Sequence, residues 1–284
     1  MKQKLAFFSA ALLLLACLGG GNYYYRDFYR AKQPRAMVSL GGLSSIREED
    51  PVFLVAHRGL SAVAPENTVP AIRQAALVGY YAAEFDIQET ADGQWAVMHD
   101  EGLFRMTDGW EKIAKRSLAE LRELRVTNGA NIALYPDLRI PSLEDILDIC
   151  EEGGIRPQIE IKAGSPEALE GLIALLRERN LMREAMLISF EQEILIQLHT
   201  LAPELEIWYL IPVLDSKQLA LCLDTPDFRV AFNGNHRKNT PEAIRAFQDA
   251  GLALSCWTID DPAVLERLYN LGIRHFTTNL ILPG

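Results

Sequence analysis

Residues 83–99 read AEFDIQETADGQWAVMH, and this stretch decides how the strands of the chain are counted. The runs 83–88 and 95–99 both have the apolar, β-branched and aromatic composition of strands. Only six residues separate them, too few for the crossover helix that joins two parallel neighbours. Asp92-Gly93 in the gap is a strong signal for a hairpin turn. The second run is therefore expected to pair antiparallel with the first, outside any parallel barrel.

Strand-like runs alternate with helical patterns from Pro51 onward. Besides 95–99, the expected strands are 52–56, 83–88, 157–162, 185–190, 207–211, 229–233, 252–259 and 274–278. Helical patterns between them include 67–79, 166–180, 240–250 and 262–271. Eight β-strands alternating with helices predict an α/β fold, a TIM (β/α)8 barrel with a β-hairpin excursion after the second strand. An open doubly wound sheet is the alternative, although no glycine-rich phosphate loop follows any strand.

The hairpin also predicts which residues face one another. With a two-residue turn at Asp92-Gly93, Ala91 pairs with Gln94, and Asp86 lies directly across from His99. The Cβ atoms of directly opposed residues are about 4.5–5.5 Å apart. His99 is therefore expected beside an acid at the carboxyl end of the second barrel strand, where barrel active sites lie. A longer or bulged loop would change this register.

The charge of the chain is unevenly distributed. The net charge is −10, but residues 1–35 carry six Lys or Arg and one Asp, which leaves 22 basic and 37 acidic residues in the rest. Such an acidic surface repels polyphosphate backbones and argues against a nucleic-acid partner. A phosphate-bearing substrate would have to be attracted locally, by a metal ion or a few placed cations. The apolar fraction of 49% is sufficient for a large core.

Residues 1–25 are expected to be a signal peptide or membrane anchor, because Lys2 and Lys4 precede an apolar run. Three alternatives stay open. Leu14-Leu15-Ala16-Cys17 resembles a lipoprotein processing box, which would make Cys17 the lipidated residue. The uncharged stretch of about 21 residues could instead span a bilayer once, or the segment could be cleaved for secretion. We expect an exported protein, anchored by lipid or by a single N-terminal span in a bacterial cell envelope.

Residues 26–50 have the mixed charge and the Pro and Gly content of a linker. The remaining 51–284 carry the whole alternating pattern, and we expect them to form the barrel domain.

Two histidines stand at the ends of predicted strands. His57 is followed by Arg58 and by Gly59, which allows a tight turn, and His99 is followed by Asp100. Either histidine alone is more often structural than catalytic. Their occurrence together at strand ends favours proton transfer, for which histidine is well suited near neutral pH.

Two acid-bearing strands predict a metal site. Glu84 and Asp86 are two residues apart and point to one face, as a shared divalent cation requires. Buried carboxylates need compensation, and an ion pair with Arg58 or Lys162 is the alternative to a metal. Glu160 and Lys162 repeat the spacing, as a third metal ligand and a phosphate contact or as a structural Glu–Lys pair.

A helix start follows the first strand at Pro65-Glu66-Asn67-Thr68. Asn67 or Thr68 is expected to cap the helix. Glu66 is either an ordinary first-turn acid or a residue of the site, with no preference from the sequence.

The order of these motifs is more specific than any one of them. They are His57-Arg58-Gly59, Pro65-Glu66-Asn67-Thr68, Glu84-x-Asp86, Thr90-x-Asp92-Gly93, His99-Asp100, Arg105-Met106-Thr107-Asp108-Gly109, Ile140-Pro141-Ser142-Leu143-Glu144, Glu160-x-Lys162 and Cys256-Trp257-Thr258-Ile259. Together they resemble the glycerophosphodiester phosphodiesterase family over about residues 52–280.

The resemblance implies a TIM-barrel phosphoric diester hydrolase that cleaves glycerophosphodiesters to sn-glycerol 3-phosphate and an alcohol. It implies general acid and base roles for His57 and His99. Under it, the three carboxylates bind one divalent cation, Ca²⁺ or Mg²⁺; these are Glu84, Asp86 and Glu160. Substrate contacts are implied for Arg58, Lys162 and Trp257, the first two with the phosphate and the last in the pocket wall.

Two departures from the family pattern concern specificity. The family usually ends its last strand with Thr-Asp-x-Pro, but this chain reads Thr277-Thr278-Asn279-Leu280. Arg105-Met106-Thr107 also stands where Arg-Thr-Thr is usual. Neither removes a catalytic group, but Asn279 leaves the terminal acid absent.

Two other functions are weighed. A lysophospholipase D-type activity on membrane lipids shares the chemistry and fits an anchored N-terminus, so that the substrate is a small glycerophosphodiester or a lysophospholipid. A catalytically silent barrel that acts as a binding protein is the other alternative, against which the intact histidines and carboxylates argue.

Overall fold

The computed structural model describes residues 37–43, 46–47, 49–224, 228–235 and 237–284. The expected signal peptide or anchor at 1–25 lies outside these residues, as does 26–36 of the expected linker. The described residues between 37 and 284 form one compact unit. Among the described residues, no helix is both long enough and apolar enough to traverse a bilayer.

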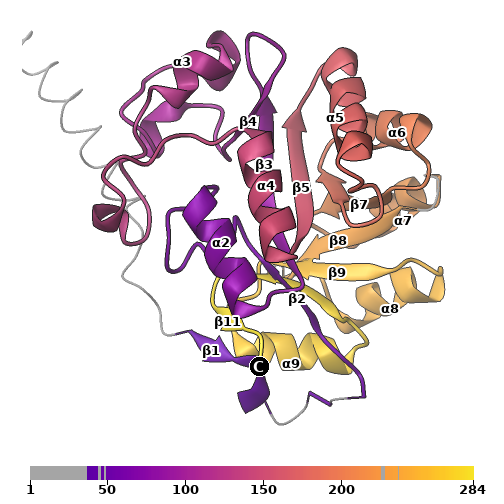
Figure 1. The fold of residues 1–284 in the computed structure, drawn as a ribbon. Coiled ribbons are helices and arrows are strands. Elements are labelled where there is room, and N and C mark those ends of the chain that lie inside the picture. The colour runs from indigo at the N-terminus through magenta and orange to yellow at the C-terminus, as the bar shows by residue number, and fades with distance from the viewer. Residues whose placement is uncertain (1–36, 44–45, 48, 225–227, 236) are drawn as a thin grey trace, which may run out of the picture. The chain divides into compact units, whose positions relative to one another are not determined.

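Eight parallel strands of the described chain close into a barrel, because the last strand pairs with the first (Figure 1). In order around the barrel they are β2 (Phe53–Ala56), β3 (Ala82–Glu89), β5 (Arg156–Ala163), β6 (Met186–Ser189), β7 (Glu206–Ile211), β8 (Arg229–Asn233), β9 (Leu254–Trp257) and β10 (His275–Thr278). Each coincides with an expected strand to within two residues at either end. The predicted TIM barrel is confirmed.

Helices surround the barrel (Figure 1). They are α2 (Val69–Val78), α3 (Leu118–Arg122), α4 (Leu143–Gly153), α5 (Pro166–Glu178), α6 (Gln192–Leu201), α7 (Ser216–Leu223), α8 (Pro241–Asp249) and α9 (Pro262–Asn270). Helices α5, α8 and α9 each begin at a proline that follows a Ser, Thr or Asp whose side chain accepts a backbone N–H. Such residues fix a helix start.

Alternation along the strands divides outer from inner side chains. In β5, Ile159 and Ile161 are buried in the core between barrel and helices. Gln158, Glu160 and Lys162 face a cavity inside the barrel. The predicted faces of this strand are confirmed, and its polar residues are therefore available to a site.

The β3–β4 hairpin forms, but with a longer turn than predicted. Strand β4 (Trp95–Val97) pairs antiparallel with β3. The Thr90 N–H donates to the Gln94 carbonyl at 2.9 Å, which makes a three-residue loop. Gly93 at its third position has a φ of +73°, the left-handed conformation of a hairpin bulge. The Thr90 hydroxyl fixes the wider loop, because it bonds Asp92 at 2.6 Å and accepts the Gln94 N–H at 3.0 Å.

The extra loop residue moves the register by one, so the predicted pairs Ala91–Gln94 and Asp86–His99 are wrong. The Met98 N–H donates to the Asp86 carbonyl at 2.9 Å, and His99 lies one residue beyond. The Gln88 side chain donates to the carbonyls of Met98 and His99 at 2.9 and 3.1 Å. His99 is thus held at the barrel mouth by the turn of the chain after β4.

Between β4 and α4 the chain makes an excursion with a small core of its own (Figure 1). It contains helix α3 and the short 3₁₀ helices η2 (Leu103–Arg105), η3 (Ile113–Lys115) and η4 (Ile132–Leu134). The buried residues of this core are Ala96, Met98, Leu103, Met106, Ile113, Leu121, Val126 and Ile140. This separate core supports the loop that carries His99 and Asp100.

The described part of the expected linker packs against the barrel domain. Strand β1 (Val38–Ser39) pairs in parallel with β11 (Ile281–Leu282), and the 3₁₀ helix η1 (Leu40–Gly42) follows it. Asp50 accepts a hydrogen bond from Arg274 Nε at 2.6 Å. These contacts join the first described residues to the end of the chain.

The amino end of the barrel is closed by aromatic and charged side chains. His275 packs against Phe53, Tyr81 and Trp208, with ring centroids 4.6 to 5.8 Å apart. Glu206 forms ion pairs with Arg156 at 3.3 Å and Arg229 at 3.5 Å.

Candidate active site

A cavity of about 140 Å³ lies within the barrel mouth, and its two sides differ in chemistry. The side from β2, β3, β5 and the β3–β4 hairpin is charged: His57, Arg58, Glu84, His99, Glu160 and Lys162. The side from β6 to β9 is largely apolar: Ile188, Phe190, Leu210, Ala231 and Trp257. The cavity therefore fits a molecule with a charged end and a less polar end.

The turn after β2 places His57 and Arg58. Gly59 has a φ of +72°, and a Cβ there would lie 2.6 Å from the Ala71 carbonyl carbon, so glycine is required. Arg58 itself has a φ of +57°, and its N–H donates to Glu84 Oε2 at 2.7 Å. A non-glycine residue in this conformation persists only where its surroundings hold it, as they do at many functional sites.

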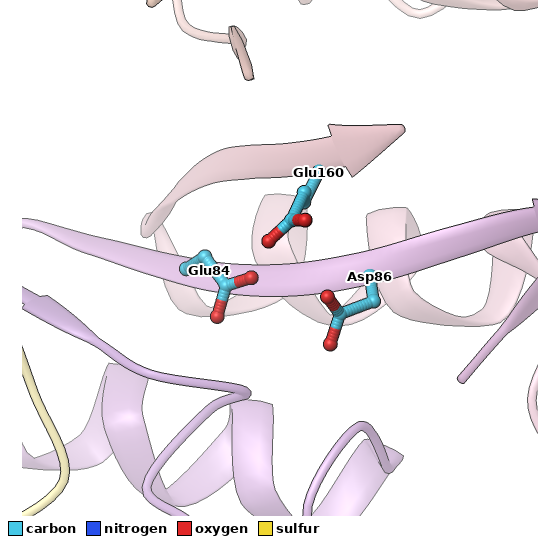
Figure 2. Close-up of side chains that lie close together, drawn as sticks. All are labelled: Glu84, Asp86 and Glu160. Atoms are coloured by element: carbon cyan, nitrogen blue, oxygen red, sulfur yellow. The ribbon is translucent and has the colours of Figure 1, made fainter. Parts of the chain in front are cut away.

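Three carboxylates from neighbouring strands converge beside this turn (Figure 2). Glu84 and Asp86 lie on β3 and Glu160 on β5, and one oxygen of each lies within 4.8 Å of the others. All three are buried, and Asp86 is paired with Glu160 across the two strands. Their oxygen-rich, compact arrangement suits a hard divalent cation.

One of these carboxylates has an oxygen without a partner. It is Glu84 Oε1, which is shielded from solvent, whereas Asp86 Oδ1 faces Lys162 Nζ. Burial, together with the negative charges of Asp86 and Glu160, raises the pKa of Glu84 well above its usual value. Unpartnered buried carboxylates are costly, and a bound cation would remove this cost. The residues therefore fit the metal that the sequence predicts.

Cationic side chains offset part of the negative charge. Lys162 Nζ lies 2.9 Å from Asp86 Oδ1 and also contacts Glu160, and Arg58 Nε lies 3.5 Å from Asp86 Oδ2. Burial alone would raise the pKa of Asp86, but Arg58 and Lys162 lower it overall. The ion pairs weighed against a metal are present, yet they leave Glu84 Oε1 without a partner.

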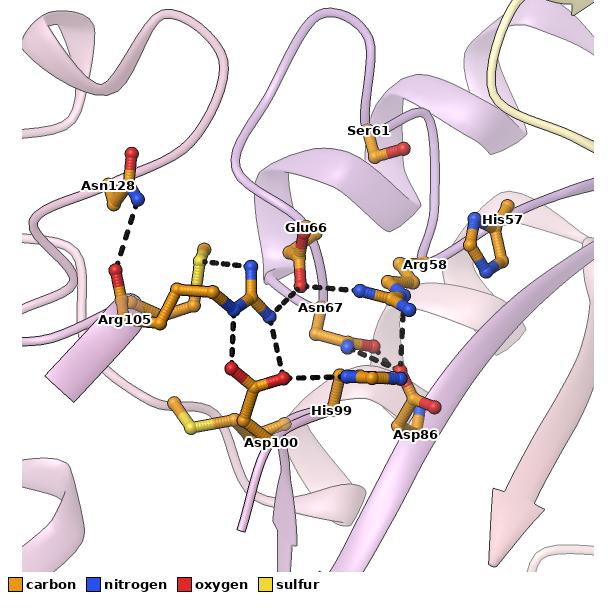
Figure 3. Close-up of polar contacts among 12 residues, drawn as sticks. His57, Arg58, Ser61, Glu66, Asn67, Asp86, His99, Asp100, Arg105 and Asn128 are labelled. Carbon is orange, nitrogen blue, oxygen red and sulfur yellow. Dashed lines mark hydrogen bonds and ion pairs between the residues drawn. The ribbon is translucent and has the colours of Figure 1, made fainter. Parts of the chain in front are cut away.

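Asn67 is a site residue rather than the expected helix cap (Figure 3). Its Nδ2 donates to Asp86 Oδ2 at 2.7 Å, and its Oδ1 accepts the Asp86 N–H at 3.0 Å. Thr68 is the cap residue of α2, but its side chain bonds the Pro65 carbonyl instead. Asn67 has a φ of +57°, so the turn before the helix aims it at β3.

Glu66 joins two arginines at the rim of the charged side (Figure 3). Its Oε1 accepts from Arg58 Nη1 at 2.8 Å and from Arg105 Nη2 at 2.6 Å. Arg105 also binds Asp100, and Asp100 Oδ1 lies 2.7 Å from His99 Nδ1. Glu66 therefore belongs to the network that fixes both Arg58 and, through Arg105 and Asp100, His99.

His57 has a different partner. Its Nδ1 lies 2.8 Å from Oδ1 of Asn279, the residue that replaces the expected acid. Burial and the adjacent Arg58 lower the pKa of His57 to about 4, although the hydrogen bond to Asn279 opposes this shift. His57 is therefore neutral near pH 7 and able to accept a proton.

An aromatic pair forms part of the apolar side. The rings of Phe190 and Trp257 meet edge to face, 5.5 Å apart, and the Trp257 Nε1–H donates to the Ala231 carbonyl at 3.2 Å. Trp257 lines the pocket, as the sequence predicts, but Phe190 was not predicted. Phe190 directly follows Ser189, the last residue of β6, and this position at a strand end was the signal that could have identified it.

All eight residues predicted for the site contribute to one region: seven line the cavity, and Asp86 lies beneath it, bonded to Lys162 and Asn67. Sequence reasoning missed the supporting roles of Asp100, Arg105 and Asp260 and gave Asn67 only a cap role. It left Glu66 undecided between helix and site, and it noted Asn279 only as a departure from the family pattern.

Comparison with known proteins agrees with this geometry. Residues 57–281 match the model of the glycerophosphoryl diester phosphodiesterase family, a range that includes every predicted site residue. A glycerophosphodiester phosphodiesterase of Bacillus subtilis (strain 168) is 29% identical over 265 residues, which cover 85% of this chain and 88% of the relative. Human glycerophosphodiester phosphodiesterase 1 is 33% identical over 161 residues, which cover 55% of this chain and 48% of the relative.

Solved structures share the fold. A phosphodiesterase of Oleispira antarctica, in complex with the product sn-glycerol-3-phosphate, aligns with a TM-score of 0.71 at 24% identity over 80% of this chain and 92% of that one. A glycerophosphodiester phosphodiesterase of Agrobacterium tumefaciens aligns with a TM-score of 0.65 at 26% identity over 80% of this chain and 96% of that one. From the match over residues 57–281, the chain belongs to the glycerophosphoryl diester phosphodiesterase family and is a phosphoric diester hydrolase.

Proposed function

We propose that this protein hydrolyses glycerophosphodiesters to sn-glycerol 3-phosphate and an alcohol, with a divalent cation and two histidines. One observation carries the proposal: three carboxylates converge at a cavity lined by His57 and His99, and one of them, Glu84, has a buried oxygen without a partner. The product complex of the Oleispira antarctica protein, which has the same fold, supports the substrate class.

Glu84, Asp86 and Glu160 would hold the cation, for which Ca²⁺ and Mg²⁺ are the candidates because all donors are carboxylate oxygens. When bound, a divalent cation offsets the charge that develops on the phosphoryl oxygens. Arg58 and Lys162 lie beside the carboxylates and can contact the same phosphate. Their preorganised charges favour the transition state over the diester.

The two histidines divide the proton transfers. Neutral His57 accepts the proton of the attacking hydroxyl, which belongs either to the substrate glycerol or to water. A bond from this oxygen to phosphorus forms while the bond to the alcohol breaks. Attack by water gives glycerol 3-phosphate directly, whereas attack by the glycerol hydroxyl gives a cyclic phosphate that water must then open. His99 donates a proton to the leaving alkoxide, and Asp100 at 2.7 Å stabilises the protonated ring that this step requires.

The apolar side of the cavity favours a second candidate substrate. Five apolar side chains face the phosphate-binding residues: Ile188, Phe190, Leu210, Ala231 and Trp257. A lysophospholipid would place its headgroup phosphate at the charged side and its acyl-bearing glycerol against this wall. Membrane attachment through the N-terminus and location in the cell envelope stay predictions, since residues 1–36 lie outside the described part.

The direct test is a substrate panel with purified protein: glycerophosphocholine, glycerophosphoethanolamine and lysophosphatidylcholine, each with EDTA, Ca²⁺ or Mg²⁺. We expect release of glycerol 3-phosphate or lysophosphatidic acid with at least one cation, and its loss with EDTA. Full turnover in EDTA after exhaustive dialysis would refute metal dependence. Binding without turnover under every condition would instead support the silent-barrel alternative.

A further inference from the structure

Two polar residues connect to His57 in series without lining the cavity. Asn279 follows β10, and its Oδ1 lies 2.8 Å from His57 Nδ1. Asp260, between β9 and α9, accepts two hydrogen bonds from Asn279: the backbone N–H at 2.8 Å and Nδ2–H at 2.9 Å. The three residues form a chain from a carboxylate, through an amide, to an imidazole.

This chain determines which way the Asn279 amide faces. A carboxylate only accepts hydrogen bonds, so the Nδ2 of Asn279 must face Asp260 and its Oδ1 must face His57. Ser61 donates its hydroxyl to the same Oδ1 at 3.0 Å, which is compatible with this orientation. Oδ1 has no proton, and therefore the Nδ1 of neutral His57 carries one.

The elements around the chain hold it in place. Thr278 is fully buried, and its Oγ1 accepts the N–H groups of Leu280 and Ile281 at 3.1 and 3.0 Å. The Ile259 N–H donates to the Thr277 carbonyl at 2.8 Å, which ties the loop of Asp260 to β10. The His57 N–H donates to the Thr278 carbonyl at 2.9 Å.

We propose that Asp260 and Asn279 are positioning residues that hold His57 as its Nδ1–H tautomer, so that Nε2 is the nitrogen that accepts the proton. The inference rests on the proposed function, because it concerns the base of that reaction. The group that contacts His57 is therefore the neutral Asn279 amide, and the Asp260 carboxylate contacts Asn279 instead of His57. His99, by contrast, contacts the Asp100 carboxylate directly. The two histidines therefore have Nδ1 partners of different charge.

The most direct test of the proposal is Asp260→Asn. An asparagine side chain has both an acceptor and a donor, so the Asn279 amide could bind it in either of its two orientations. We expect kcat for glycerophosphodiester hydrolysis to fall about 10-fold or more with little change in KM. In ¹⁵N-histidine NMR of the full chain, His57 should change from one tautomer to a mixture. Comparison with the His57→Gln spectrum identifies its signals among those of the five histidines.

The exchange variant Asp260→Asn with Asn279→Asp supplies the rescue. The carboxylate introduced at position 279 would accept the His57 Nδ1–H. The amide introduced at position 260 would still accept the backbone N–H and would donate to that carboxylate. We expect the single tautomer and most of kcat to return, with the acid limb of the pH profile moved to higher pH by the adjacent charge. A merely structural role would not move that limb.

Gln248→Ala is the control, because it removes an amide hydrogen bond of 2.8 Å to Leu271 on the outside of the barrel. Wild-type kcat and an unchanged His57 tautomer in Asp260→Asn would overturn the proposal, as would an exchange variant no more active than Asp260→Asn. If the wild type hydrolyses no diester, the proposed function fails. The NMR comparison still decides the tautomer in that case.

Discussion

The two ends of the barrel carry the same kinds of side chain in opposite states. At the amino end, Glu206 is satisfied by Arg156 and Arg229 and also accepts the Trp208 Nε1–H at 2.9 Å. His275 is enclosed by aromatic rings. The charged groups there are paired with one another, and this end closes the fold.

At the carboxyl end the same residue types surround a cavity. Glu84 Oε1 is buried without a partner, and His57 and His99 both line the cavity. A histidine with nearby arginine and glutamate therefore does not by itself identify a site. Unsatisfied acceptors beside a cavity distinguish the end that binds a ligand.

The histidines give the largest expected contrast. His57→Ala or His99→Ala should each lower kcat by about 10²–10⁴, because each removes a proton-transfer group. Neither should lower the melting temperature by more than a few degrees. Initial rates of glycerophosphocholine hydrolysis with saturating cation, and thermal unfolding, measure the two effects.

His275→Phe is the matched control from the closed end, where an aromatic ring retains the packing against Phe53. It should keep wild-type kcat. Wild-type turnover in His57→Ala, or an equal loss in His275→Phe, would erase the functional contrast between the ends.

Glu84 at the open end and Glu206 at the closed end should respond differently to the same substitution, one in cation affinity and the other in stability. Glu84→Gln should weaken cation binding about 10-fold or more, because it removes a ligand, and should leave the metal-free protein as stable as the wild type or more so. Glu206→Gln should not change cation affinity but should lower the stability by about 1 kcal/mol, since Arg156 and Arg229 lose a charged partner. Calorimetric titration and metal-free thermal unfolding test both, and destabilisation by Glu84→Gln without metal would contradict the interpretation.

The smallest expected effect concerns pH. Burial lowers the pKa of His275 to about 4, while an unfolded histidine titrates near 6.5. Between these values only the unfolded chain takes the proton. The stability that neutral His275 confers is therefore complete above about pH 6.5. It decreases as the pH is lowered from 6.5 toward 4, by up to about 1.4 kcal/mol per pH unit. Urea unfolding from pH 7 to 4.5 should show a shallower loss for His275→Phe, and parallel curves would rule this account out.

Most of the fold could be predicted because its signals are local. The alternation of apolar and polar residues in a strand, and the proline that begins a helix such as α5 (Pro166–Glu178), can be recognised in a few consecutive residues. The hairpin register could not be predicted in this way. Side-chain hydrogen bonds of Thr90 with Asp92 and Gln94 determine whether the loop has two or three residues. One added residue moves every pair by one.

The predicted site residues shared one property: their chemistry is visible in a motif. Asn67, Asp260 and Asn279 act through partners far away in the sequence. Asn67 bonds Asp86, nineteen residues on, and Asn279 bonds His57 across 222 residues. Short-range patterns gave Asn67 an ordinary cap role, since nothing near it indicates that a positive φ of +57° turns it toward β3.

The closure of β10 on β2 also has a consequence for the order of folding. His57 obtains both its backbone acceptor, Thr278, and its side-chain partner, Asn279, from the other end of the domain. Contacts between residues so distant in sequence form slowly, because a long loop must first be closed. We therefore expect the base to be among the last groups to reach its native environment during refolding. Regain of activity should then lag behind the regain of helical signal.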